Sequence, residues 1–321
     1  MVAGGPAVQV AVVVATVLGL WVGARLLVDS TVRLARRVGL SELTIGLTVV
    51  AAGTSTPELI VTAGAAVDGF GDIAVGNVVG SNVYNLAFVL GVVSLLRVVP
   101  IERSLVHRDG VMLVASTLLG GAVLLDGTVT RTEGAVLAGL FVLYTAYLLR
   151  TGDAGATVAD EDDPPIGVAT DRVAVPGRDA LLLVAGLAVV LVSGDLLVGA
   201  ATTLARGAGV SEWVIGGTVV AAGTSTPEFA VSLVAVRSGR LGVSVGNVVG
   251  SNVFNVLGVL GVAAAVRPLA VGPAALDTVA WLLVVSTAMV AALWTGRQLS
   301  RPEGGLFALS EVGRWVLGLL G

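Results

Sequence analysis

The sequence predicts an all-α polytopic membrane protein of about ten transmembrane helices, arranged as two inverted five-helix repeats. Three observations lead to this prediction: the apolar composition, the number of bilayer-length segments, and a pair of polar motifs that occurs twice. The 321 residues are 55% hydrophobic and 12% charged, with a mean hydropathy of +0.97. Such a chain has too little polar surface to fold as a soluble globule of this size.

The individual spans follow from cutting the chain at charges, prolines and glycines, given that a membrane helix needs about 20 apolar residues. The first half contains segments 7–28, 44–66, 73–98, 110–126 and 133–150, and the second half contains 179–200, 213–236, 242–265, 273–294 and 303–320. The fourth and tenth are the weakest, because one is short and the other includes Glu311 and Arg314. The first is longer than the core of a signal peptide, so we expect it to be retained.

The two halves repeat one another at a constant offset of 170 positions. Residues 46–91 read GLTVVAAGTSTPELIVTAGAAVDGFGDIAVGNVVGSNVYNLAFVLG, and residues 216–261 read GGTVVAAGTSTPEFAVSLVAVRSGRLGVSVGNVVGSNVFNVLGVLG. Because each unit holds an odd number of spans, the second copy enters the membrane from the opposite side, as in many secondary transporters. The predicted organisation is a first repeat at 1–150, a linker at 151–178 and a second repeat at 179–321.

The distribution of arginines predicts the orientation. If the N-terminus is outside, cytoplasmic loops hold Arg33, Arg36, Arg37, Arg97, Arg103, Arg108, Arg150, Arg172, Arg178, Arg237, Arg240, Arg297 and Arg301, and the outer side holds Arg131, Arg206, Arg267 and Arg314. The positive-inside rule then predicts external termini and a cytoplasmic linker, in a multi-pass protein of the cell (plasma) membrane. The acidic run in this linker, ADEDDPP, is typical of a solvated connection. Calcium sensing is the weaker alternative, because the spaced ligands of a calcium loop are missing.

Composition also limits the chemistry. The chain has no cysteine, which excludes disulfides and thiolate metal sites. Its arginines are scattered, so a nucleic-acid partner is not expected. The sequence offers neither a histidine cluster for a metal nor a nucleophile paired with a base. We therefore expect no enzymatic activity, no cofactor and no obligate protein partner, and we expect the lipid bilayer and transported ions as the partners.

Each long motif places a glutamate directly after a proline, in the middle of an apolar run: Glu58 in the first repeat and Glu228 in the second. A carboxylate near the bilayer centre costs roughly 2.5 to 3.5 kcal/mol on insertion scales, so it is expected to face a cavity, an ion or a partner. Two such carboxylates related by an internal repeat predict one shared ion site. The preceding prolines add to this site, because Pro57 cannot donate to the carbonyl of Gly53, and a cation would satisfy that freed oxygen.

The motifs also supply further oxygen ligands on matching helix faces. In the first motif, residues three, four and seven positions before the glutamate share its face, and in the second motif a serine and an asparagine stand four apart. The candidates are Ala51, Thr54, Ser55, Glu58, Ser81 and Asn85, with Ala221, Thr224, Ser225, Glu228, Ser251 and Asn255 at the equivalent positions. Hard cations such as Ca²⁺, and Na⁺ by the same logic, prefer oxygen ligands of this kind.

Close helix packing is the alternative interpretation of glycine and serine patterns in membrane spans. Against it, each repeat keeps TVVAAGTSTPE and VGNVVGSNV unchanged, whereas the surrounding apolar residues differ. Identical polar segments in divergent apolar surroundings favour ion binding.

At these motifs the chain resembles the sodium/calcium exchanger family of the cation/calcium exchanger superfamily, in its prokaryotic form. GTSTPE with GNVVGSNVYN is similar to the first alpha-repeat of that family, and GTSTPE with GNVVGSNVFN to the second. The resemblance implies an antiporter that exports Ca²⁺ against inward Na⁺ through one central site by alternating access. It implies Ca²⁺ ligands at the Glu58 and Glu228 carboxylates and the Thr54 and Thr224 carbonyls. It implies Na⁺ sites that add Ala51, Ser55, Ser81, Ala221, Ser225 and Ser251, with Asn85 and Asn255 beside them.

The last motif position leaves the coupling ion open. It is an acid in some family members and an amide in others, and here it is an amide in both repeats, Asn85 and Asn255. Two carboxylates balance one Ca²⁺, whereas three Na⁺ would leave a positive charge unbalanced in a low dielectric. Exchange driven by H⁺ or dependent on K⁺ is therefore the alternative. A cation channel is less favoured, because it needs a continuous pore with several weak sites.

Overall fold

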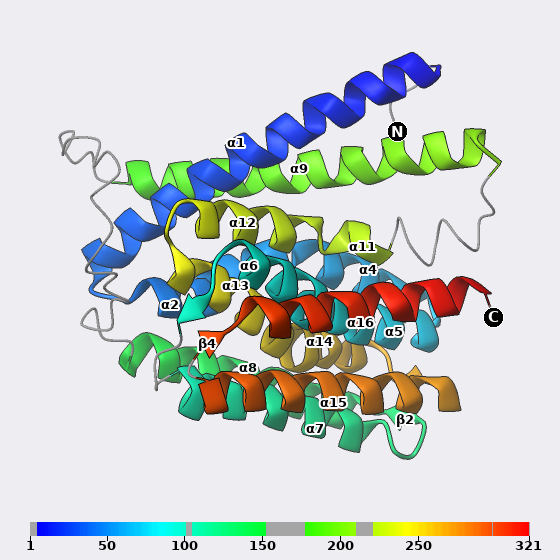
Figure 1. Ribbon diagram of the computed structural model, residues 1–321. Coiled ribbons are helices and arrows are strands. Elements are labelled where there is room, and N and C mark those ends of the chain that lie inside the picture. The colour runs from blue at the N-terminus through cyan, green and yellow to red at the C-terminus, as the bar shows by residue number, and fades with distance from the viewer. Residues whose placement is uncertain (1–4, 101–104, 152–176, 210–220, 297, 321) are drawn as a thin grey trace.

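The computed structural model describes residues 5–100, 105–151, 177–209, 221–296 and 298–320, and this part of the chain is almost entirely helical (Figure 1). Six of its helices are long and apolar enough to cross a bilayer, and a bent pair, Glu42–Thr54 with Thr56–Asp68, makes a seventh. The prediction of an all-α polytopic membrane protein is confirmed. The predicted linker, including its acidic run, lies outside the described residues.

The described elements follow one another in nearly the same order in both halves, although the π-helical turn at 105–110 has no counterpart in the second half and residues 212–220, which correspond to 42–50, lie outside the described residues. The first half contains α1 (Pro6–Val38), α2 (Glu42–Ile45), η1 (Gly46–Val50), α3 (Ala51–Thr54), α4 (Thr56–Asp68), α5 (Gly71–Val83), η2 (Tyr84–Val89), α6 (Leu90–Leu96), β1 (Val99–Pro100), η3 (Leu105–Gly110), α7 (Val111–Val123), β2 (Thr128–Val129) and α8 (Arg131–Thr151). The second contains α9 (Arg178–Gly207), α11 (Ala221–Thr224), α12 (Thr226–Arg237), α13 (Leu241–Val253), η5 (Phe254–Val259), α14 (Leu260–Val266), β3 (Leu269–Ala270), α15 (Pro273–Gly296), β4 (Gln298–Leu299) and α16 (Arg301–Leu320). The η elements are π-helical turns.

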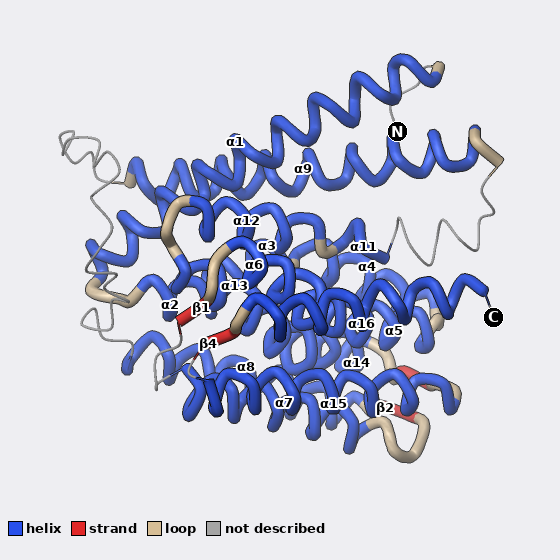
Figure 2. Tube along the Cα trace, in the orientation of Figure 1, coloured by secondary structure: helices blue, strands red, loops and turns tan. Residues whose placement is uncertain are grey.

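The 170-residue offset of the sequence is preserved in the structure. Helix α13 begins and ends 170 positions after α5, and η5 and α14 correspond in the same way to η2 and α6. The short strands show how the halves are related: β1 pairs with β4 and β2 pairs with β3, antiparallel, although β1 corresponds to β3 and β2 to β4 in the repeat (Figure 2). Both strands of each half therefore pair with strands of the other half, in a reciprocal, pseudo-twofold arrangement.

Helices α1 and α9 lie together along one side of the molecule, whereas α5 with α6 and α13 with α14 form its centre (Figure 1). The most apolar window of the α5–α6 span is 78% buried and that of the α13–α14 span is 89% buried, against 28% for α1 and α9. Close backbone contact joins α1 to α9, because a Cβ at Gly23 would lie 2.9 Å from the Val190 amide. The polar motifs thus occupy the interior, and the outer helices face lipid.

Two helices extend beyond the membrane spans predicted for them, because α1 continues to Val38 past position 28 and α9 continues to Gly207 past position 200. The extension of α1 is held by the carboxylate of Asp179, which pairs with Arg33 at 2.8 Å and with Arg37 at 2.9 Å. A helix that projects beyond the apolar layer keeps its backbone hydrogen bonds in water, so hydropathy alone does not mark its end.

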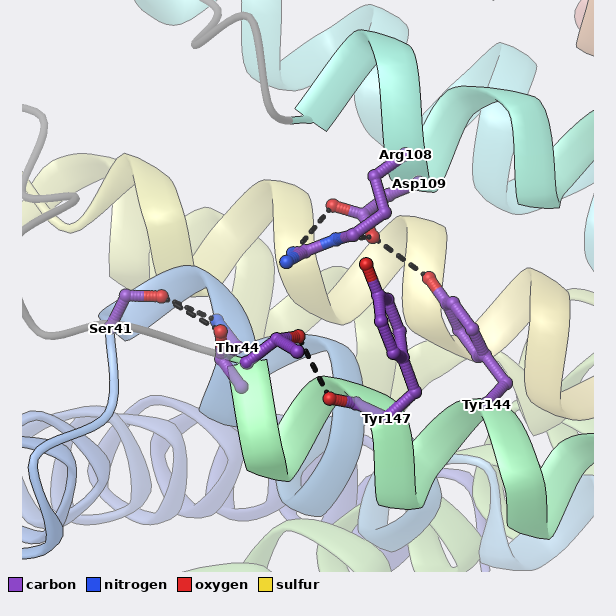
Figure 3. A network of polar contacts seen from close by, with 7 residues as sticks. Ser41, Thr44, Arg108, Asp109, Tyr144 and Tyr147 are labelled. Carbon is purple, nitrogen blue, oxygen red and sulfur yellow. Dashed lines mark hydrogen bonds and ion pairs between the residues drawn. The ribbon is translucent and has the colours of Figure 1, made fainter.

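Another buried carboxylate outside the repeated motifs lies in η3, two residues before the start of α7 (Figure 3). The side chain of Asp109 is fully buried and accepts hydrogen bonds from Arg108 Nε at 2.8 Å, from Arg108 Nη2 at 3.1 Å and from the Tyr144 hydroxyl at 2.9 Å. Because all its partners are supplied within η3 and α8, this carboxylate is compensated and ties the two elements together.

Candidate ion-binding site

The span that carries the first glutamate is broken directly before it. Ser55 leaves the helical conformation with φ −81° and ψ 15°, and the two halves of the span are bent by 48°. The equivalent Ser225 has φ −90° and ψ 10°. The expectation of one continuous helical face through these motifs is therefore wrong, because Pro57 begins a new helix after the break. The Gly53 carbonyl is also not left to a cation, since the Thr56 hydroxyl donates to it at 2.7 Å.

The break brings the two glutamates into one site between the repeats. Glu58 and Glu228 are both 0% exposed. Ser55 Oγ donates to Glu228 Oε1 at 2.7 Å, and Ser225 Oγ donates to Glu58 Oε1 at 2.9 Å. These crossed bonds obey the pseudo-twofold relation and place one shared pair of carboxylates at the centre of the molecule.

Two asparagines that were not among the residues predicted from the sequence donate hydrogen bonds to the main-chain carbonyls of the glutamates. Asn77 Nδ2 donates to the Glu58 carbonyl at 3.3 Å and to Thr62 Oγ1 at 2.9 Å. The equivalent Asn247 Nδ2 donates to the Glu228 carbonyl at 3.3 Å and to Ser232 Oγ at 3.1 Å. Both asparagines lie in the unchanged VGNVVGSNV segment, and their invariance between the repeats was the available signal.

The inner surface of the site carries polar atoms that are buried and have no hydrogen-bond partner. These are Oε2 of Glu58, Oε2 of Glu228, Oγ of Ser251, Oδ1 of Asn255, and both side-chain polar atoms of Asn85. Within the described residues neither glutamate forms an ion pair. Unpartnered buried carboxylates are costly, and cations coordinated by these oxygens would remove that cost.

The predicted ligands lie in two pairs of corresponding segments, α3–α4 with α11–α12 and α5–η2 with α13–η5. Ten of the twelve are buried: Ala51, Thr54, Ser55, Glu58, Ser81, Asn85, Ser225, Glu228, Ser251 and Asn255. Thr224 is half-buried, and Ala221 begins α11. The Thr54 hydroxyl donates to Asn247 Oδ1 at 2.9 Å. Among the described residues no group of three acidic, histidine or cysteine side chains is placed to hold a metal ion, so the site combines two carboxylates with neutral oxygens.

One side of the site is closed by the first repeat. Gly246 of α13 is buried against α2 and η1, and a Cβ there would lie 2.6 Å from the Leu43 carbonyl and 2.9 Å from the Leu47 amide. At the 170-residue offset, the counterparts of α2 and η1 are residues 212–220, which lie outside the described residues.

A helical membrane protein with an inverted repeat and a central pair of uncompensated carboxylates has the architecture of a secondary cation transporter. The sequence profile of the family described as sodium/calcium exchanger protein matches residues 8–150 and 179–310. The chain belongs to this family.

Individual relatives agree with this assignment. The chain is 36% identical over 309 residues to the candidate antiporter CaxA of Alkalimonas amylolytica, covering 94% of this chain and 95% of that one. It is 28% identical over 315 residues to the sodium/calcium exchanger MaX1 of Methanosarcina acetivorans, covering 88% and 90%. A solved structure of the sodium-calcium exchanger NCX_Mj, soaked with Na⁺ and Ca²⁺, superimposes with a TM-score of 0.81 at 28% identity, over 95% of this chain and 96% of that one. The predicted fold of ten helices in two inverted repeats is confirmed by this likeness.

Proposed function

We propose that the chain exports Ca²⁺ in exchange for Na⁺ through one site between Glu58 and Glu228, near the middle of the membrane. The observation that carries this proposal is the buried carboxylate pair whose second oxygens have no partner. One Ca²⁺, or monovalent cations in its place, would balance the two negative charges in a site of low dielectric. The names of the relatives MaX1 and NCX_Mj support Na⁺ and Ca²⁺ as the exchanged ions.

The proposed ligands are assigned to Ca²⁺ or to Na⁺ according to the charge of each ion. The two carboxylates, with the carbonyls of Thr54 and Thr224, form the Ca²⁺ site in this proposal, because Ca²⁺ takes several oxygen ligands and prefers charged ones. The Na⁺ sites add neutral oxygens from Ala51, Ser55, Ser81, Ala221, Ser225 and Ser251, with Asn85 and Asn255 beside them. The unpartnered Ser251 hydroxyl and the unpartnered side-chain oxygens of the two asparagines support this assignment.

Transport by alternating access requires that the site open to each side in turn, and the inverted repeat supports this mechanism. Gly246 and Gly76 lie in identical sequence segments of opposite repeats, so the close contact that Gly246 makes with α2 can form at the equivalent position when access changes sides. The arginine distribution favours external termini.

This orientation, with a cytoplasmic linker at 151–178 and the cell membrane as location, has a direct test. The chain contains no cysteine, so single cysteines can be introduced without removing any. A cysteine near Gly69, in the loop after α4, is expected to react with an impermeant maleimide on intact cells. A cysteine near Gly239, the equivalent position in the second repeat, is expected to react only after permeabilisation. The reverse pattern would overturn the proposed orientation.

Protons are the competing coupling ion, because the same unpartnered carboxylate oxygens can bind them. Proteoliposomes loaded with Na⁺, with ⁴⁵Ca²⁺ outside, are expected to take up Ca²⁺ when the Na⁺ gradient is imposed, without K⁺ and at equal pH on both sides. Uptake driven by a pH gradient alone, without a Na⁺ effect, would replace Na⁺ by H⁺ in the proposal. Uptake that requires K⁺ would make the exchange K⁺-dependent, and uptake without any counter-ion would favour a channel.

A further inference from the structure

Three asparagines outside the carboxylate pair form a chain of hydrogen bonds between the repeats. Asn82 Nδ2 donates to the main-chain carbonyl of Asn252 at 3.0 Å. Asn255 Nδ2 donates to Asn82 Oδ1, also at 3.0 Å. All three side chains are buried, and of the three only Asn255 stands among the expected ligands.

The first acceptor in this chain of hydrogen bonds, the main-chain carbonyl of Asn252, fixes the orientation of the side-chain amides of Asn82 and Asn255. A main-chain carbonyl only accepts hydrogen bonds, so Asn82 must turn its NH₂ group toward Asn252. The Asn82 carbonyl oxygen is then left as an acceptor, and only the NH₂ group of Asn255 can donate to it. The carbonyl oxygen of Asn255 is consequently directed away from Asn82, and it is one of the buried atoms without a partner.

We propose that Asn82 is a positioning residue for the ion site, which holds the NH₂ group of Asn255 so that the oxygen of this amide faces the cations. This inference rests on the proposed ion site. An amide presents either a donor or an acceptor, and an NH₂ group turned toward a cation would oppose binding, whereas a carboxylate presents two equivalent oxygens. A site that uses an amide at this position therefore needs a partner that selects one of its two orientations.

The equivalent arrangement in the other repeat is not formed in this conformation. Asn252 Nδ2 donates to the Val248 carbonyl at 2.7 Å within its own helix, and Asn252 Oδ1 has no partner. Both polar atoms of the Asn85 side chain are also without partners. The orientation of the amide is thus fixed for Asn255 and not for Asn85, which makes Asn252 a matched control for Asn82.

The test is a double-mutant cycle between Asn82→Leu and Asn255→Asp, read as the apparent Na⁺ and Ca²⁺ affinities of ⁴⁵Ca²⁺ exchange. Asn82→Leu is expected to weaken affinity about three- to tenfold, the value of one hydrogen bond, with the maximal rate less affected. Combined with Asn255→Asp, the same change should have little effect, because a carboxylate has no NH₂ group to orient. Equal losses in both backgrounds would show that Asn82 is only structural. Asn252→Leu, which keeps its main-chain carbonyl, should combine additively with Asn255→Asp.

A second variant serves if Asn82→Leu does not fold, as judged by size-exclusion chromatography. Asn82→Asp retains an acceptor for the Asn255 NH₂ group but loses the donor to the Asn252 carbonyl, so affinity should fall less than in Asn82→Leu when Asn255 is present. Combined with Asn255→Asp it should fall further, because two carboxylates would face each other across about one hydrogen-bond length. No difference between the backgrounds would overturn the inference. A failure of the ion site itself is seen separately, as Ca²⁺ binding that survives Glu58→Gln.

Discussion

Ser55 and Glu228 come from opposite repeats, and the serine hydroxyl donates to the carboxylate at 2.7 Å. Their counterparts, Ser225 and Glu58, make the same bond at 2.9 Å. Each repeat therefore completes the carboxylate site of the other. Because each serine hydroxyl donates its hydrogen to a glutamate, the lone pairs on its oxygen remain available to a cation. The two crossed serine–glutamate hydrogen bonds thus orient both carboxylates and place a neutral hydroxyl oxygen beside each of them.

The first prediction concerns the charge of this pair. Glu58→Gln and Glu228→Gln each remove half of the negative charge of a dehydrated site, and loss of one partner in a buried charged cluster costs about 3 to 5 kcal/mol. Either change alone is expected to weaken Ca²⁺ binding by more than about a hundredfold and to abolish exchange, with the fold retained. ⁴⁵Ca²⁺ binding to the purified protein measures the first effect, and proteoliposome flux measures the second.

Glu133→Gln is the matched control for these variants. Glu133 is half-buried and caps α8, accepting from the Thr130 amide at 2.8 Å, and glutamine serves this position as well. It should leave exchange unchanged. Near-normal Ca²⁺ affinity in a well-folded Glu58→Gln or Glu228→Gln protein would contradict a shared site.

The second prediction concerns the close contact between Gly246 and α2. Gly246→Ala places a methyl group 2.6 Å from the Leu43 carbonyl, and overpacking of this kind costs about 1 to 3 kcal/mol. Hydrogen–deuterium exchange of residues 42–50 is expected to increase, because α2 and η1 are pushed away from α13. Gly139→Ala is the control, because Gly139 of α8 is exposed and no described atom lies within 4 Å of its Cβ position. Similar exchange of residues 42–50 in both variants would contradict the close contact between Gly246 and α2.

The surroundings of Gly246 also show how far the sequence predicts the structure. The inverted repeat, the polytopic fold and the carboxylate pair all follow from residues that are repeated and costly to place in lipid. The break at Ser55 does not follow, because a proline can kink a helix or begin a new one. Nor does the close contact of Gly246 with Leu43, because a glycine in a membrane span indicates close packing without naming its neighbour.

The third prediction follows from the number of carboxylates. Two negative charges balance one Ca²⁺ or two Na⁺, so exchange is expected to move no net charge. Uptake of ⁴⁵Ca²⁺ should then be insensitive to a potential imposed with K⁺ and valinomycin. Moving one net charge per cycle would instead shift the equilibrium Ca²⁺ gradient ~50-fold per 100 mV. A shift of that size would show that a third cation is exchanged and that a neutral site accommodates its charge.

The last prediction concerns the effect of adding negative charge to the site by replacing Asn85 or Asn255 with aspartate. Asn255→Asp places a third carboxylate beside Glu58 and Glu228, and crowded carboxylates bind protons more readily than isolated ones. Exchange is therefore expected to be inhibited more steeply as pH falls below neutrality, where protons neutralise the added charge, and Na⁺ should bind more tightly above it. Asn85→Asp should behave in the same way, because the repeat places it at the equivalent position. Na⁺ and Ca²⁺ affinities measured from pH 6 to pH 9 distinguish the possibilities. Unchanged pH profiles in both variants would place the two amides in helix packing, away from the transported ions.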